Sequence, residues 1–309
     1  MRRESLVVTL LSALFLLSIF IGLWGQLSNH HSKKTAGQAS QFLKKGGIGI
    51  LSISGPISFS SGNGMMPSTG PGTSSLLQEL SELEKDPKVK ALIIRINSPG
   101  GTVGASQELF TALLRFKEKK KVPVVASIGD IGASGAYYAA LAADTIFANP
   151  GSLVGSIGVI MGNIDVSKLA EKHGVGFKIF KSGPYKDLLS MWRPSSENEK
   201  QLLQALIDSV YTQFLNALID QRPLNKKQAE KMAQGQIFTG EQAQSNQLVD
   251  ELGGLHEAIA FTGKLANLGD EPVLIKKSKR SFYDVLKQWQ GSIDTLLPTH
   301  FFNQPVFHY

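Results

Sequence analysis

Hydrophobic positions along the chain follow two alternating patterns. Short apolar runs of strand length recur through the first two thirds, and most are followed by stretches with apolar residues every three or four positions. The predicted strands are Ile48–Ile53, Val89–Ile96, Val122–Ser127, Asp144–Ala148 and Phe177–Lys181. The predicted helices cover about Ser75–Glu84, Val103–Lys117, Val166–His173, Glu197–Asp220, Lys226–Ala233, Gly240–Asn246 and Leu255–Asn267. This alternation predicts an α/β layered body.

The N-terminal end carries a different pattern, because the 19 residues Leu6–Trp24 contain no charge. That length spans a hydrocarbon core of about 30 Å as a helix. A cleaved secretory signal has a shorter apolar region and a small-x-small cleavage site, so we expect an uncleaved signal-anchor. Arg2 and Arg3 lie close to the span, which favours a cytoplasmic N-terminus and an exported body. The predicted parts are a cytoplasmic end at 1–5, a transmembrane anchor at 6–24, a linker at 25–47, a folded domain at 48–270 and a C-terminal extension at 271–309.

The longest predicted helix, Glu197–Asp220, has an apolar stripe at helical spacing. Its members include Leu202, Leu206, Val210 and Phe214. We interpret the stripe as core or as a contact between subunits, and not as a ligand-binding surface.

One turn stands out for its chemistry. An apolar strand leads into Ile128-Gly129-Asp130-Ile131-Gly132-Ala133-Ser134-Gly135, and small residues typical of a helix follow. A hydroxyl at such a turn lies near unpaired N–H groups at the positive end of a helix dipole, which suits a nucleophile whose reaction creates an oxyanion. The alternative is that Ser134 only caps the helix.

Composition removes several classes of function. The 309 residues include no cysteine, which excludes disulfides, thiolate nucleophiles and Cys-based metal sites. The six histidines have no helical ligand spacing, so we predict no metal site. The net charge of +7 comes partly from runs such as Lys117–Lys121 and Lys276–Arg280. We interpret these runs as solvated faces, with attraction to an anionic membrane as the alternative. They lack aromatic interleaving, so nucleic-acid binding is not expected.

A serine nucleophile needs a base. No histidine lies near Ser134 in the sequence, and the turn lacks the closing glycine of G-x-S-x-G, which argues against an α/β-hydrolase. Lysine remains, because burial can lower the pKa of an amine toward neutrality. Lys186 is the candidate: it follows the Gly183-Pro184 turn and precedes two leucines.

Several motifs in one order resemble a known family. They are Asn97-Ser98-Pro99-Gly100-Gly101, Ala133-Ser134-Gly135-Ala136-Tyr137-Tyr138, Gly155-Ser156-Ile157-Gly158-Val159, Lys181-Ser182-Gly183-Pro184-Tyr185-Lys186-Asp187 and Gln247-Leu248-Val249-Asp250-Glu251-Leu252-Gly253. The chain is similar over about 48–266 to the single-domain form of the signal peptide peptidase A family, peptidase family S49. The resemblance implies the crotonase/Clp-protease type of α/β fold.

The same resemblance implies a role for five residues. Ser134 would be the nucleophile and Lys186 the general base, while Ser156 would orient the lysine amine. The backbone N–H groups of Gly101 and Gly135 would form the oxyanion hole. The local chemistry agrees, because Pro99-Gly100-Gly101 joins a strand to a helix and presents N–H groups unobstructed by a side chain.

The resemblance also implies a function. The protein would be a membrane-anchored serine endopeptidase that cleaves hydrophobic signal-peptide remnants, with its catalytic domain on the extracytoplasmic side of the cell membrane. It would form a homo-oligomeric ring in which a neighbour completes each active site, and it would need no cofactor. Two alternatives are a related S49 membrane protease with another natural target and a non-catalytic scaffold of the same fold. A crotonase-type acyl-CoA enzyme fits poorly with the N-terminal span and the Ser–Lys pair.

Overall fold

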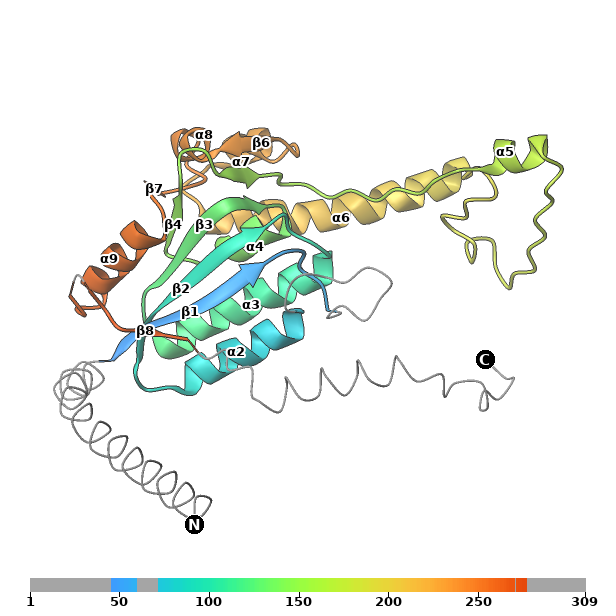
Figure 1. The fold of residues 1–309 in the computed structure, drawn as a ribbon. Helices are drawn as coiled ribbons and strands as arrows, with labels where there is room; N and C mark the ends of the chain where they lie inside the picture. Colours follow the sequence, from blue (N-terminus) through green and yellow to red (C-terminus); the bar gives the residue numbers. More distant parts are fainter. Residues whose placement is uncertain (1–45, 60–71, 270, 277–309) are drawn as a thin grey trace, which may run out of the picture. The chain divides into compact units, whose positions relative to one another are not determined.

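The computed structural model describes residues 46–59, 72–269 and 271–276. The predicted anchor at 6–24, nearly all of the linker and most of the C-terminal extension lie outside the described residues. The described part is a mixed α/β structure, as the sequence pattern predicts (Figure 1). Its elements are β1 (Gly47–Ser54), α2 (Thr73–Lys85), β2 (Val89–Ser98), α3 (Val103–Lys120), β3 (Val124–Ala133), α4 (Gly135–Ala140), β4 (Thr145–Ala148), β5 (Leu153–Gly155), α5 (Ser167–Lys172), α6 (Glu197–Gln221), α7 (Lys226–Met232), β6 (Ile237–Thr239), α8 (Gly240–Ser245), β7 (Glu251–Leu252), α9 (Leu255–Leu265) and β8 (Leu274–Ile275).

The strands form one sheet in the order β6-β5-β3-β2-β1-β8; β4 also pairs with β3, and β7 pairs with β4. Every pairing is parallel except that of β5 with β6. The first half of β3 pairs with β4 and its last three residues pair with β5. Because β8 pairs with β1, the sheet includes residues that the sequence analysis assigned to the C-terminal extension.

Each face of the sheet packs against helices. Along β2, the side chains of Leu92 and Ile94 join the core under α2, α3 and α4, whereas Ala91 and Ile93 join a smaller cluster with Ala258 of α9. Successive side chains of a strand point to opposite faces, so a strand covered on both faces is apolar throughout. This arrangement explains the uninterrupted apolar run of β2.

The glycine-rich stretch before Ser134 corrects one prediction. The sequence analysis ended the strand at Ser127, but β3 continues to Ala133. The pairing with β2 shifts register between Ile96 and Ser98, which marks an irregularity of the β-bulge type. The Asn97 side-chain oxygen accepts hydrogen bonds from the amides of Asp130 and Ile131, each at 3.1 Å. The Asn97 side chain therefore pairs the two amides where the backbone hydrogen bonds between β2 and β3 are interrupted. The extended strand places Ser134 directly after its C-terminal residue, Ala133.

The predicted strand Phe177–Lys181 is wrong. These residues have no regular secondary structure, and all are exposed. Among the described residues, no strand pairs with this segment. Its residues belong instead to an extended arm, residues 159–195, which also contains α5 (Figure 1).

Helix α6 connects this arm to the body. Its N-terminus is fixed by a capping box between Ser196 and Glu199. Only its last third buries apolar residues in the body, including Phe214 and Leu218. Among the described helices, α6 is long and apolar enough to cross a bilayer by length and composition. Because its C-terminal part is buried, we assign it to the folded body.

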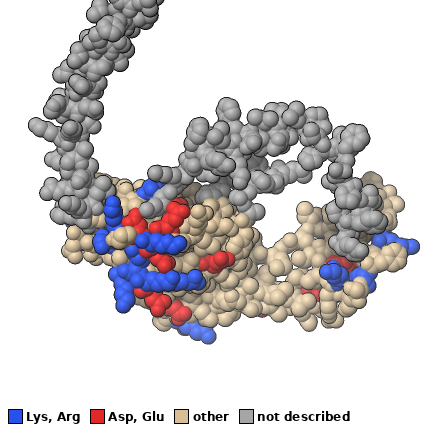
Figure 2. Space-filling model, turned by 90° about the horizontal axis from the view of Figure 1, so that it is seen from below, with Lys and Arg blue, Asp and Glu red and all other residues tan. Residues whose placement is uncertain are grey.

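The basic run at the end of α3 is largely paired. Lys117 forms an ion pair with Asp144 and Lys119 with Glu84, both at 3.0 Å, and the Lys120 amine donates to the carbonyl of Asp86. Figure 2 shows Lys and Arg side chains interleaved with Asp and Glu on the face it presents. These pairs favour the interpretation of Lys117–Lys121 as a solvated face.

Candidate active site

Ser134 occupies the tight connection between β3 and α4. Its backbone has φ 53° and ψ −125°, a region that L-residues rarely adopt. The Ser134 amide donates to the Gly155 carbonyl at 2.8 Å, and its own carbonyl accepts from the Tyr138 amide at 2.9 Å. Ser134 stands at the N-cap position, yet its side chain makes no capping hydrogen bond. The backbone is thus fixed in a strained turn, while the hydroxyl is not used by the helix.

The two glycines predicted to form the oxyanion hole lie side by side. An ideal Cβ placed on Gly100 would lie 2.6 Å from the Gly135 nitrogen, and one placed on Gly135 would lie 3.3 Å from the Gly101 nitrogen. Gly135 is the first residue of α4, so its N–H has no acceptor within that helix. The structure brings both backbones to the wall of one cavity together with Ser134.

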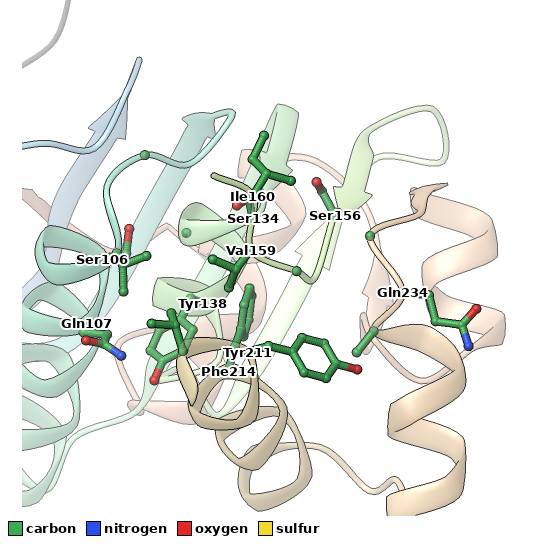
Figure 3. Close-up of a pocket in the computed structure, with 17 residues that line it drawn as sticks. Ser106, Gln107, Ser134, Tyr138, Ser156, Val159, Ile160, Tyr211, Phe214 and Gln234 are labelled. Carbon is green, nitrogen blue, oxygen red and sulfur yellow. The ribbon is translucent and has the colours of Figure 1, made fainter. Parts of the chain in front are cut away.

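Ser156 reaches the same cavity from the neighbouring strand. β5 ends at Gly155, whose partner in the sheet is Ala133, so Ser134 and Ser156 each follow a paired residue. Ser156 also has a positive φ, 52°, and its amide donates to the Gln236 carbonyl at 2.8 Å. The cavity is therefore lined by four of the five predicted residues, Ser134, Ser156, Gly101 and Gly135. Figure 3 shows the first two of them.

The cavity has a volume of about 520 Å³ and a mostly apolar lining. Its lining includes Val103, Tyr138, Val159, Val210 and Phe214. The ring of Tyr138 packs between those of Phe110 and Phe214, with ring centroids 4.8 and 4.7 Å away. Burial raises the pKa of the Tyr138 hydroxyl, and a hydrogen bond with Gln107 opposes that rise. Such a cavity suits an apolar side chain of a substrate.

Sequence reasoning missed part of this wall. The stripe on α6 was interpreted as core or subunit contact and not as a ligand surface, but Val210, Tyr211 and Phe214 line the cavity. These three residues are neighbours in the apolar stripe, so the stripe was the only sequence signal for this part of the cavity wall. Periodicity alone cannot distinguish a residue that faces a core from one that faces a cavity.

Lys186 does not line the cavity in this single copy. It lies in an exposed turn of the arm, where its amide donates to the Gly183 carbonyl at 3.2 Å. In Figure 1, the segment between α5 and α6 lies at the end of α6 opposite to the end that packs on the body. Among the described residues, those that line the cavity include no Asp, Glu, His, Lys or Arg. Within the described part of one copy, Ser134 and the backbones of Gly101 and Gly135 therefore share a cavity that has no lysine, histidine or carboxylate in its lining.

The fold and the site thus define a class: an α/β protein in which a serine in a strained turn shares a cavity with the adjacent backbones of Gly101 and Gly135. Comparison with known proteins names the family. A sequence model described as Peptidase family S49 matches residues 116–269. A protein of Synechocystis sp. that is named as a protease is 44% identical over 202 residues, which cover 65% of this chain and 72% of that protein.

Two further similar proteins are also named as peptidases or proteases. A protein of Enterococcus faecium named as signal peptide peptidase SppA is 30% identical over 247 residues, 78% of this chain and 72% of that protein. Protease 4 of Salmonella typhi is 34% identical over 235 residues, 74% of this chain but 37% of that protein. The chain belongs to peptidase family S49 and is a serine peptidase.

Proposed function

We propose that the protein is a membrane-anchored endopeptidase with a Ser134–Lys186 dyad, in which Lys186 comes from a neighbouring copy in a ring. It would degrade hydrophobic signal-peptide remnants at the extracytoplasmic face of the cell membrane. The observation that carries the proposal is the strained Ser134 turn beside Gly101 and Gly135, in a cavity whose described lining has no lysine, histidine or carboxylate.

The arm supports a neighbour as the source of the lysine. It exposes large apolar side chains, among them Ile160 at 99%, Ile164 at 73% and Phe180 at 92%. Leu202 and Leu206 on the free part of α6 are also well exposed. Contiguous exposed apolar surface marks an interaction site. A second copy packed on this surface would bury it, and a head-to-tail contact that repeats can close into a ring.

The chemistry follows from the proposed roles. The Ser134 Oγ attacks the scissile carbonyl carbon while its proton passes to the neutral Lys186 amine. The oxygen of the tetrahedral intermediate accepts hydrogen bonds from the N–H groups of Gly101 and Gly135. The C–N bond then breaks as the leaving amine takes the proton from Lys186. Water hydrolyses the acyl-enzyme with the same lysine as base, and Ser156 would hold the lysine amine toward Ser134.

Two observations support the proposed substrate class and location. The apolar cavity fits the hydrophobic core of a signal peptide, and a relative carries that substrate in its name. The predicted anchor at 6–24 would hold the site near peptides that remain in the membrane. The branching of β3 between β4 and β5 is consistent with the proposed crotonase/Clp-protease fold.

Mixing two inactive variants tests the shared site. Ser134→Ala and Lys186→Ala should each abolish labelling by a fluorophosphonate and hydrolysis of apolar peptides. In a 1:1 mixed ring, half of the sites keep a serine and half of their neighbours keep a lysine, so activity should return to about a quarter of wild type. Lack of recovery in rings shown to be mixed would exclude a lysine from a neighbour. An active Lys186→Ala enzyme would exclude the dyad itself.

The preferred peptide needs a separate measurement. Full-length enzyme in detergent should cleave isolated signal peptides with a higher kcat/KM than polar peptides of equal length. Equal rates would leave a serine peptidase of this family with another natural target.

A further inference from the structure

The turn that carries Lys186 is tied to α6 by a dense ionic cluster. Asp187, the next residue, accepts two hydrogen bonds from the Arg193 guanidinium, at Oδ1 and Oδ2, both at 2.7 Å. The Lys181 amine also binds Asp187 Oδ1 at 2.7 Å and the Pro184 carbonyl at 3.0 Å. The Asp187 carboxylate therefore links Lys181, which precedes Lys186 in the sequence, to Arg193, which follows it.

Arg193 extends the same cluster to α6. Its Nη1 donates to Glu199 Oε2 at 2.8 Å, while Nη2 pairs with Glu199 Oε1. Glu199 also accepts from the Ser196 amide at 2.7 Å, as the third residue of the capping box. One planar guanidinium thus joins two carboxylates, one beside Lys186 and one in the first turn of α6.

The two carboxylates of this cluster are shielded from solvent in a region that is otherwise exposed, while the side chains of Lys181 and Arg193 are each 33% exposed. The side chains of Asp187 and Glu199 are only 7% and 3% exposed, whereas Lys186 itself and most of the arm are exposed. The Arg193 guanidinium holds the pKa of Glu199 down to about 2 and holds the pKa of Asp187 well below its usual range. Both carboxylates therefore stay charged at neutral pH.

We propose that Arg193 is a positioning residue, which locks the Lys186 turn onto the N-terminus of α6. The proposal rests on the proposed role of Lys186 as the base. Helix α6 has 25 residues, about 37 Å at 1.5 Å per residue. Its last third is embedded beside the cavity through Phe214. The helix thus acts as a rigid spacer that fixes where the lysine of one copy lies relative to the serine of the next.

A purely structural role for the cluster predicts different behaviour. If Arg193 only holds the arm together, its loss should weaken assembly or stability and affect catalysis only through them. If it positions Lys186, its loss should lower the rate of the chemical step in rings that still form and still bind the probe. The test therefore separates the rate of acylation from the affinity for the probe.

The experiment compares Arg193→Met, Arg193→Lys and Asp187→Asn in the full-length protein. Ring size comes from light scattering, and the maximal acylation rate and apparent affinity come from fluorophosphonate titrations. We expect Arg193→Met to keep the ring and to bind the probe within about two-fold, but to lower the maximal rate by about ten-fold or more. Arg193→Lys should keep part of the rate, because lysine has the same charge but cannot form the planar guanidinium's paired hydrogen bonds to both carboxylates.

Lys200→Met is the matched control. Lys200 pairs with Glu197 on the same first turn of α6, but both side chains are exposed, at 59% and 79%. Exposed pairs contribute little, so this variant should acylate within about two-fold of wild type.

Each outcome decides between the proposals. A normal maximal rate in Arg193→Met, or a loss that tracks dissociation of the ring, overturns the positioning role while leaving the dyad intact. Full activity in Lys186→Ala overturns the dyad instead. If Arg193→Met does not fold, the nearly isosteric Asp187→Asn decides: a lowered rate in intact rings supports the role, and a wild-type rate overturns it.

Discussion

Replacing Gly101 by alanine tests the oxyanion hole most directly. A Cβ at this position would lie 1.9 Å from the Ile57 carbonyl oxygen and 2.6 Å from the Ile57 nitrogen. The Gly101 segment cannot simply yield, because Ile57 donates to the Gly100 carbonyl at 2.8 Å and accepts from the Thr102 amide at 2.9 Å. The clash is therefore with a hydrogen-bonded backbone and not with a mobile side chain.

The size of the effect follows from the distances. A carbon normally approaches an oxygen no closer than about 3.3 Å, so the two segments must separate by about 1.4 Å to relieve the 1.9 Å contact. A displacement of roughly 1 Å at a catalytic group costs about 10²-fold in rate. Loss of one oxyanion donor costs about 10²–10³-fold, or about 2.7–4 kcal/mol of transition-state stabilisation. We therefore expect acylation of Ser134 in Gly101→Ala to slow by at least about 10²-fold.

Gly104→Ala is the matched control three residues away. A Cβ there would lie 3.7 Å from the Phe59 ring, an ordinary contact. The position is within α3, where alanine is favoured over glycine by about 0.5–1 kcal/mol. Fluorophosphonate labelling and thermal unfolding of both variants make the comparison. A folded Gly101→Ala protein that acylates Ser134 at the wild-type rate would refute the assignment of Gly101.

Three further predictions concern stability, specificity and pH. Tyr137→Phe removes the hydroxyl that donates to the buried Leu248 carbonyl at 2.7 Å, and it should lower the free energy of unfolding by about 1–3 kcal/mol in urea titrations. Phe214→Leu should enlarge the cavity, so that kcat/KM shifts toward peptides with larger apolar side chains, and an unchanged preference would remove Phe214 from the specificity wall. The pKa of Glu199 is lowered from 4.5 to about 2 by the Arg193 guanidinium. Its contribution to stability is therefore complete above about pH 4.5 and is lost as the pH falls toward 2. The protection of amides in the first turn of α6 against hydrogen exchange, measured relative to the intrinsic exchange rate at each pH, should fall over that interval, and protection that is already absent at pH 6 would contradict it.

Much of the fold could be predicted from local sequence patterns. The 3–4 spacing of Leu76, Leu80 and Leu83 places one buried stripe on α2, and the Ser196–Glu199 capping box marks the start of α6. Such signals lie within one element, so they can be read without knowledge of the partner. The turn at Ser134 was also local, since a strand, a small-residue turn and a helix follow one another in the chain.

The failures share a physical cause, because each depended on a partner distant in sequence. Phe177–Lys181 has the composition of a strand, but a strand exists only where another strand pairs with it. The end of β3 was misjudged because the side chain of Asn97, from the neighbouring strand, satisfies amides in the glycine-rich stretch. The cavity wall on α6 was missed for the same reason. The motif order of a family pointed to five residues, and four of them lie at one cavity; such an order reflects tertiary proximity, which periodicity does not.

The separation of Lys186 from the cavity has a consequence for control of the activity. The serine, its strained backbone and the paired N–H donors are built by the sheet of one copy, and their geometry does not require another copy. The described cavity lining holds no lysine, histidine or carboxylate, so under the proposed dyad a lone copy has Ser134 in its cavity but keeps its own Lys186 in the arm, away from that cavity. A peptidase made this way would stay inactive until it assembles, because a base-free serine lacks the general-base contribution of about 10²–10⁴-fold. Activity per copy should then rise with protein concentration along the same curve as ring formation, and a dilute monomer that is fully active would exclude this form of control.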